Sequence, residues 1–495
     1  NENISHSISE GTTINLNSNL LFRHKFEKKG RNFSANLQFS LSESDRGGYL
    51  DAIYKYEGDT SNTIVNQRNE QKNNNLLYGA TLTYTEPLGN RKYLEGTYSF
   101  RQNSNEVKRP VYDIHQDQEI LDDSLSNWYD SDYRYHLAGM NFRVNKKKYT
   151  MTVGGALQQT YLTGNLQIHD VAISQSFRNF LPVARFNYNF SSSRHLRFDY
   201  ETSVQEPTIQ QLQPVVDNRD PLNPYRGNPA LRPSYQQSWR VNFTSFDPGT
   251  FIGFFAFLDV DYTTNAITDA VNNDNFVRTT MPVNVQDNMR VNGDATFSFP
   301  VNKIKSRVNL SANVRDEYGT NVIDGFDYYI HQRTIGSNLR YSYRYQDVFD
   351  ISLSAQLSHQ KAAYEFNQPD QKFLNQTYTA ESNLTLKKNY LLSASFEYLV
   401  YKSKSANFRQ DIALLNLSFS RYVLRNQSGE IKLSVNNLLD EALGISQTSS
   451  VNYIERTVTN SMGRYFMVSF IYALNKQLNP MGGMRKGGGM MRIIR

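Results

Sequence analysis

Hydrophobic and polar residues alternate one by one along most of this chain. Between residues 14 and 22 the even positions are mostly apolar and the odd positions mostly polar, and the same period recurs in residues 33–42, 307–315 and 466–474. A period of two places successive side chains on opposite faces of an extended strand. The pattern therefore predicts strands with one apolar and one polar face from one end of the chain to the other.

Two architectures fit such strands: a soluble sandwich with its apolar faces in a core, or a transmembrane barrel with its apolar faces in lipid. The polar faces here are dominated by Asn, Ser, Thr, Gln and Arg, which suits a wet lumen. Many alternating segments run about 12 to 18 residues, whereas about 9 to 11 residues cross a bilayer and soluble strands average about 5 or 6. We therefore predict an all-β fold, a transmembrane antiparallel β-barrel of the outer-membrane type.

Short and long connections alternate between these strands, as they do in outer-membrane barrels with tight periplasmic turns and long outer loops. The nine short turns fall at residues 28–31, 88–91, 145–148, 191–194, 246–250, 301–305, 346–349, 387–390 and 425–429. The longest outer connections are expected near residues 45–66, 102–130, 205–232 and 265–284. Counting the flanks of the turns, with a last strand at residues 463–474, predicts about nineteen strands.

The direction of the end strands adds an expectation. The first visible strand, residues 11–26, runs toward the short-turn end, and so does the last. A single barrel with both ends in the periplasm then needs an odd number of strands before residue 1, and three more would make twenty-two. We expect that this segment is the C-terminal part of a larger barrel chain, or that another chain supplies the missing strands.

Composition narrows the function. The 495 residues contain no cysteine, which excludes disulfide scaffolds, thiolate metal sites and a cysteine nucleophile. The net charge of +6 is a mild excess, and we expect no nucleic-acid partner. The eight histidines lack metal-ligand spacing and no Gly-rich loop precedes a helix. We expect no enzyme activity, no cofactor and no metal.

Three stretches resemble a known family. Residues 205–214 (QEPTIQQLQP), 220–223 (DPLN) and 227–233 (GNPALRP) together are similar to the mid-barrel loop of TonB-dependent transporters, closest to the Bacteroidota outer-membrane β-barrel subfamily. Residues 84–89 (YTEPLG) and 435–440 (VNNLLD) agree with this resemblance. It implies a twenty-two-stranded barrel, integral to the outer membrane of a Gram-negative bacterium, that contacts outer-membrane lipid. It also implies two partners: a preceding plug domain, and TonB as the source of energy.

Two functions follow from the resemblance. The first is uptake of a scarce or large ligand through a TonB-dependent receptor. The alternative is a non-transporting barrel that serves as scaffold or subunit of an outer-membrane assembly or secretion complex. The sequence leaves open whether a surface lipoprotein or other subunits of an outer-membrane complex bind. We expect residues 1–474 to form the barrel and the Gly-, Met- and Arg-rich residues 475–495 to be a disordered periplasmic tail.

Candidate site residues lie in the loop that carries the resemblance. They are Glu206, Pro207, Leu212, Asp220, Gly227, Asn228, Pro229, Leu231 and Pro233. The loop is long and expected outside, so it could face a ligand. Its prolines also fix its shape, and for Gly227, Asn228 and Pro229 we favour this structural role.

Two further groups are candidates for contacts. Phe251, Phe255 and Phe257 share a parity with Asp259 and are expected to face the lumen, against a plug or ligand, although a slip of one residue would turn them to lipid. Basic residues gather at the short turns, where they could meet acidic lipid heads or periplasmic partners, with solvated turn residues as the simpler interpretation. They are Lys28, Lys29, Arg31, Lys146, Lys147, Lys148, Lys303, Lys305, Lys387 and Lys388.

Overall fold

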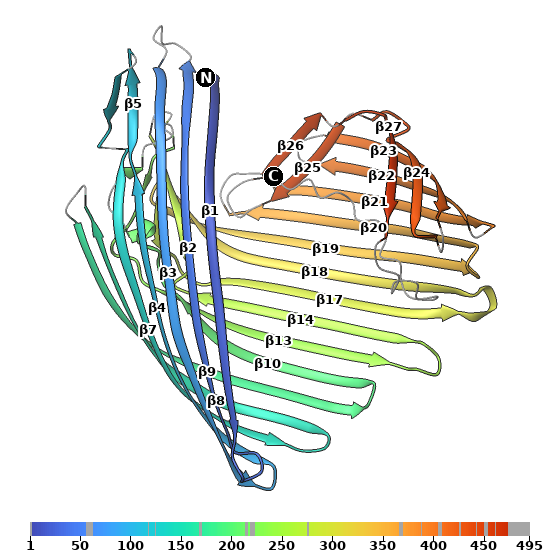
Figure 1. The fold of residues 1–495 in the computed structure, drawn as a ribbon, viewed down its shortest axis with the longest axis horizontal. Coiled ribbons are helices and arrows are strands. Elements are labelled where there is room, and N and C mark those ends of the chain that lie inside the picture. Colours follow the sequence, from blue (N-terminus) through green and yellow to red (C-terminus); the bar gives the residue numbers. More distant parts are fainter. Residues whose placement is uncertain are drawn as a thin grey trace.

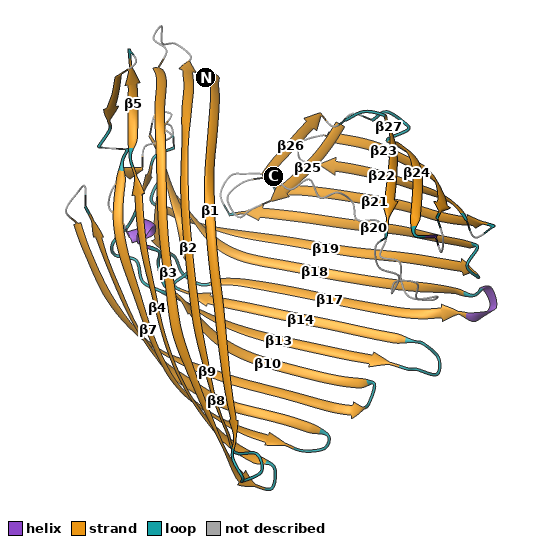
Figure 2. Cartoon of the chain, in the orientation of Figure 1, coloured by secondary structure: helices purple, strands orange, loops and turns teal. Residues whose placement is uncertain are grey.

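The chain folds almost entirely into strands (Figures 1 and 2). The computed structural model describes residues 2–473 except 56–62, 117, 124, 168–170, 213–215, 218–222, 275–276, 366–369, 388, 404–407, 425–426, 442, 450–453 and 461. One sheet holds 25 strands, almost all antiparallel, and a second sheet holds two. No helix in this described part is long and apolar enough to cross a bilayer. The predicted all-β architecture is confirmed.

Nineteen of the described strands form one continuous wall in which each strand pairs with the next. This is the number that the short turns predict. The strands are β1 (Glu2–Lys25), β2 (Asn32–Lys55), β3 (Thr63–Gly89), β4 (Lys92–Arg109), β7 (Asn127–Asn145), β8 (Tyr149–Leu166), β9 (Val171–Ser191), β10 (Arg194–Gln205), β13 (Ser234–Phe246), β14 (Gly253–Thr264), β17 (Asn288–Val301), β18 (Ser306–Ile323), β19 (Phe326–Tyr345), β20 (Phe349–Tyr364), β21 (Gln371–Leu386), β22 (Tyr390–Ser403), β23 (Phe408–Val423), β24 (Gly429–Asn436) and β27 (Tyr465–Tyr472).

The wall is strongly twisted. In Figure 1 its strands turn from upright at β1 to nearly horizontal at β20, as the twist between neighbouring strands accumulates across a large sheet. Among the described residues β1 pairs only with β2, and β27 only with β24, so β1 and β27 form the two lateral edges of the wall.

Short elements occupy the longer connections at the opposite end from the tight turns. They are β5 (Val111–His115), β6 (Gln118–Leu121), α1 (Ile209–Leu212), β11 (Val216–Asp217), β12 (Tyr225–Arg226), β15 (Ile267–Asp274), β16 (Val277–Asn284), β25 (Leu443–Ser449) and β26 (Ile454–Asn460). One short turn holds the 3-10 helix η1 (Asn302–Ile304). We call the two ends of the wall the long-loop end and the short-turn end.

The expected boundaries of several loops and strands were wrong. Residues 45–55 belong to β2 rather than to a loop, β3 already begins at Thr63, and β1 begins at Glu2 rather than at residue 11. The register of β1 and β2 is unbroken from the Glu2–Lys55 pair to the Lys25–Asn32 pair. Backbone hydrogen bonding continues here past the stretch of clear alternation, through polar residues interspersed with apolar ones such as Ile8 and Tyr49.

The two faces of the wall differ as the alternation predicts. On one face Leu20 and Leu37 lie opposite each other across β1 and β2, and Leu20 is 64% exposed. On the other face Ser40 donates a hydrogen bond to Asn17 at 2.6 Å. We call the apolar face the outer face and the polar face the inner face. An apolar face this extensive and this exposed is suited to lipid rather than to water.

Candidate functional site

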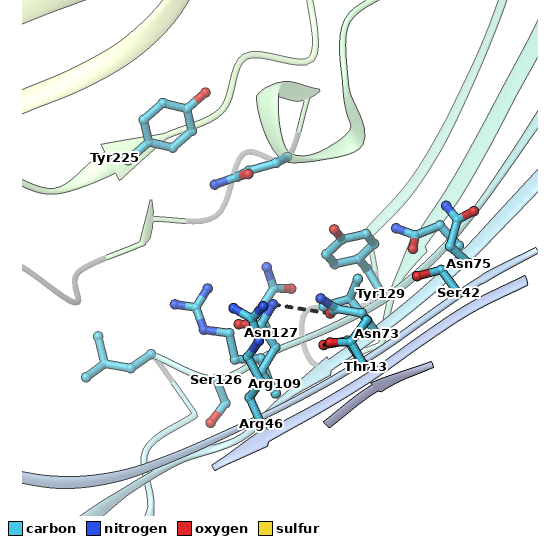
Figure 3. A pocket seen from close by; sticks show the side chains of 16 residues that line it. Thr13, Ser42, Arg46, Asn73, Asn75, Arg109, Ser126, Asn127, Tyr129 and Tyr225 are labelled. Atoms are coloured by element: carbon cyan, nitrogen blue, oxygen red, sulfur yellow. Dashed lines mark hydrogen bonds between the residues drawn. The ribbon is translucent and has the colours of Figure 1, made fainter. Parts of the chain in front are cut away.

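A polar pocket of about 560 Å³ lies on the inner face at the long-loop end (Figure 3). Its wall consists of consecutive inner-face rows in which the antiparallel register aligns side chains from neighbouring strands. One row crosses β1, β2, β3, β4 and β7 through Thr13, Ser44, Asn73, Val107 and Tyr129. Gln210 of α1 and Tyr225 of β12 complete the lining from the loop.

The pocket is basic and rich in hydrogen-bonding groups. Arg46 and Arg109 line it, and none of its sixteen lining residues is acidic. Its amides belong to Gln71, Asn73, Asn75, Asn105, Asn127 and Gln210. Carboxamides can donate and accept, whereas guanidinium groups only donate and favour carboxylate or phosphate. The lining therefore suits an anionic ligand that carries further polar groups.

Two local features affect this pocket: Gly11 has no side chain, and Tyr225 has a raised pKa. A Cβ atom on Gly11 would lie 2.5 Å from Cγ of Arg46, so the missing side chain leaves room for the arginine. Burial, with the negative charge of Asp269 as a further cause, raises the pKa of Tyr225 to about 12. The Tyr225 phenol is therefore neutral at physiological pH and keeps its proton for donation.

The loop that carries the family resemblance begins with an anchored carboxylate. Glu206 accepts hydrogen bonds from Nε2 of Gln158 at 2.8 Å and from Oγ1 of Thr160 at 3.1 Å, both buried residues of β8. Thr208 and Gln211 then form a reciprocal cap at the start of α1, with backbone-to-side-chain distances of 3.0 and 3.2 Å. The carboxylate and the cap bring the loop back onto the inner face.

A hydrophobic cluster fastens the same loop to the wall. It consists of Leu162, Leu166, Ile173, Leu212 and Leu231. The first three belong to β8 and β9, while Leu212 ends α1 and Leu231 lies near the end of the loop. Leu212 is 0% and Leu231 2% exposed. These two candidate residues are packing residues of the loop.

Asn228 connects the loop to its neighbours. Its backbone N–H donates to the carbonyl oxygen of Gln211 at 2.6 Å, and its side chain donates to the carbonyl oxygen of Pro282 in β16 at 3.1 Å. Gly227 is buried beside it, and the exposed Pro229 accepts a hydrogen bond from Gln175 through its carbonyl oxygen.

Two of the remaining loop candidates are at least half-buried. Pro207 is buried and Pro233 half-buried, like the packing residues above, whereas Asp220 lies outside the described residues. None of the described loop candidates lines the pocket, which instead takes its neighbours Gln210 and Tyr225 from the loop.

The three phenylalanines do not form one group. Phe255 and Phe257 lie in β14 opposite Thr244 and Asn242, on the inner face that also carries Asp259. Phe251 instead lies in the turn before β14, with φ of 57° and its ring centroid 6.3 Å from that of Phe246. Contact of any of them with a plug or ligand stays a prediction.

Charged side chains on β9, β10, β13 and β14 form a second inner-face group that is largely paired internally. Glu201 accepts hydrogen bonds from Arg185 at 2.5 Å and from Arg240 at 3.4 Å. Arg240 also donates to Asp259 at 3.1 Å, and Arg197 donates to Asp199 at 2.5 Å. These charges hold neighbouring strands in register and leave little net charge for a ligand.

The pocket was not predicted from the sequence. Polar residues that line it, such as Gln71, Asn73 and Asn75, do occupy every second position of their strand. Their convergence with the two arginines depends on the register of five strands. In the described part of the chain, no group of three or more His, Asp or Glu side chains could hold a metal ion.

No curated protein matches the sequence. Solved structures that the fold resembles include "Copper transporter OprC" (10% identity, 94% of this chain and 80% of that chain, TM-score 0.43) and "ferric citrate transporter FecA in the unliganded form" (10%, 89% and 62%, 0.46). A third is P. aeruginosa FpvA bound to heterologous pyoverdines (13%, 93% and 56%, 0.48).

The sequence model described as "Outer membrane protein beta-barrel family" matches residues 24–332 and 329–472. These two segments include most of the wall. The chain therefore belongs to the outer membrane protein beta-barrel family and is an integral protein of the outer membrane.

Proposed function

We propose that this chain forms the barrel wall of a TonB-dependent receptor that takes up a scarce or large ligand. The observation that carries the proposal is the basic, amide-rich pocket at the long-loop end of the inner face. The motifs at residues 84–89, 205–233 and 435–440 support it. In this proposal the long-loop end faces the cell exterior and the short-turn end faces the periplasm.

The pocket chemistry defines the class of ligand. Arg46 and Arg109 attract an anionic group, and the amides hydrogen-bond to hydroxyl or carbonyl groups around it. Tyr129 and Tyr225 add ring faces that can cover apolar parts of the same molecule. The ligand would be a polar molecule with at least one carboxylate or phosphate.

Uptake requires a step that moves the bound ligand through the lumen into the periplasm. In the proposal a plug domain fills the lumen beside the inner face, and TonB supplies the energy that displaces it. The loop fastened by Glu206 and the leucine cluster stays in place, so that the outer rim keeps its shape while the plug moves.

Ligand binding is tested with two trisaccharides of similar size, anionic trigalacturonate and neutral maltotriose. Titration of the purified protein should show tighter binding of trigalacturonate. Arg46→Gln should weaken this binding about tenfold or more, because a hydrogen bond to a charged group contributes about 1.5–3 kcal/mol. Arg290→Gln is the control, because Arg290 lies on β17, is paired with Glu317 and is remote from the pocket. Equal binding of both sugars would refute selection by charge.

Energised uptake is tested in cells that express the full-length gene. Accumulation of labelled trigalacturonate should require both the gene and TonB. Accumulation that persists without TonB would indicate a passive pore and would contradict the proposal.

A further inference from the structure

A groove crosses the outer face of the wall over six adjacent strands, from β2 to β9. Its volume is about 640 Å³, and apolar atoms form most of its lining. Small residues on β4, β7 and β8 form its floor: Gly96, Ala138 and Gly155. Aromatic rings of Tyr84, Tyr98 and Phe180 rise around them.

The register explains why the surface is hollow here. Gly96 lies between Tyr84 and Met140, and Ala138 lies between Tyr98 and Leu157, so small and large side chains alternate along neighbouring rows. A Cβ atom added at Gly96 would meet no atom within 4 Å. The space over Gly96 is therefore open.

The groove has a defined depth in the membrane. Gly96 is five residues from Arg91 in the β3–β4 turn, which corresponds to about 17 Å along a strand. The hydrocarbon core of one leaflet is about 15 Å thick, and barrel strands are tilted. The groove therefore lies at the level of the acyl chains in the leaflet at the short-turn end.

Positive charge lies at the level of the headgroups below this groove. The turns at residues 88–92 and 145–149 contain Arg91, Lys92 and three consecutive lysines, and neither contains an acidic residue. Nζ of Lys146 donates to the backbone and side-chain oxygens of Asn90, both at 2.9 Å, and so joins the two turns. Lys147 and Lys148 are exposed beside this contact.

We propose that this part of the outer face is a binding site for one anionic phospholipid of the leaflet at the short-turn end. One acyl chain lies in the groove over Gly96 and Ala138. The phosphate-bearing headgroup lies at the two basic turns, where Lys147 and Lys148 are free to approach it. This site is separate from the pocket on the inner face and does not depend on ligand uptake.

Native mass spectrometry of the full chain tests the site with phosphatidylglycerol and phosphatidylethanolamine that carry identical acyl chains. The wild-type protein should retain phosphatidylglycerol in preference. Gly96→Leu fills the groove and should lower retention of both lipids, whereas Ala355→Leu, at an outer-face position of β20 outside the groove, should not. Heat-modifiable migration on gels shows whether each variant is folded.

The headgroup is tested separately. The double variant Lys147→Gln, Lys148→Gln should reduce the preference for phosphatidylglycerol by about fivefold for each lysine replaced. Lys303→Gln, at the distant β17–β18 turn, is the control and should leave the preference unchanged. Equal retention by Gly96→Leu and Ala355→Leu would overturn the proposal. Retention of lipid A in place of the glycerophospholipid would also overturn it, because lipid A belongs to the opposite leaflet.

Discussion

Individual polar residues decide how the connections are held against the wall. Glu206 is the clearest case, because one carboxylate serves two donors of β8 that are themselves buried. At the short-turn end, Asp247 plays a similar role for a turn that is fully exposed. Both contacts can be removed without changing the alternation of the strands.

Replacing Glu206 by alanine should lower the free energy of unfolding by about 1–3 kcal/mol, because Gln158 and Thr160, both buried, each lose an acceptor, although Gln158 still donates to Thr160. Glu206→Gln should cost less, since an amide oxygen still accepts. Urea unfolding in lipid or detergent, followed by fluorescence of the two tryptophans, measures both variants. Unfolding of Glu206→Ala at the wild-type midpoint would contradict the anchoring role.

The turn at Asp247 should depend on pH. The backbone N–H of Gly249 and the hydroxyl of Thr250 donate to the carboxylate, each at 2.9 Å, and lower the pKa of Asp247. A lowered pKa in the folded state contributes stability above the unfolded pKa, about 3.9, and this contribution is lost as the pH falls through the folded pKa. Asp247→Ala should therefore unfold earlier than wild type at about pH 7, and the difference should shrink as the pH falls below about 3.9. Thr250→Ala should show part of the same effect, and a difference that is constant across this range would exclude the carboxylate as its cause.

At the level of elements, the same residue type has opposite roles on the two faces of the wall. Leu231 is buried in the cluster that fastens the loop, whereas Leu310 on the outer face of β18 is 44% exposed. Hydrophobic burial against protein is specific to shape, while burial in lipid tolerates many apolar side chains. The two leucines can therefore be compared directly.

Leu231→Ala should destabilise the protein by about 2–5 kcal/mol, the range for a buried leucine that leaves a cavity. Leu310→Ala should change the unfolding free energy much less. Urea unfolding in bilayers of identical lipid measures both. Equal losses of unfolding free energy would mean that Leu231 packs no more tightly in the leucine cluster than Leu310 packs against lipid.

The whole molecule has two chemically distinct ends, and their orientation is open to a direct test. The chain has no cysteine, so a single introduced cysteine is a unique label. Asn273 lies near the tip of the β15–β16 hairpin at the long-loop end, and Ser192 lies in the β9–β10 turn. Both positions are exposed.

On intact cells, a membrane-impermeant maleimide should label Asn273→Cys and leave Ser192→Cys unlabelled. Permeabilising the outer membrane should expose Ser192→Cys to the reagent. The reverse pattern would place the short turns outside, and the proposals for both the pocket and the phospholipid site would then be wrong about their compartments.

Much of the fold follows from local pattern. The alternation of residues 14–22 predicts two unlike faces, and the nine short turns predict the nineteen-stranded wall that the structure shows. The ends of strands were less predictable. β1 and β2 continue past their segments of clear alternation because backbone pairing does not require that pattern.

The architecture, the outer-membrane location and the chemistry of each face could be predicted from the sequence alone, because a strand places alternate side chains on opposite faces whatever its neighbours are. Where those faces form sites depends instead on the tertiary structure. Thr13 and Asn73 line one pocket with Gln210 because the register of three strands and the return of a distant loop bring them together. Leu231 is core rather than exposed loop because Leu162 and Leu166 lie beneath it. Contacts between residues so far apart in sequence depend on pairing and packing, which a local pattern does not encode.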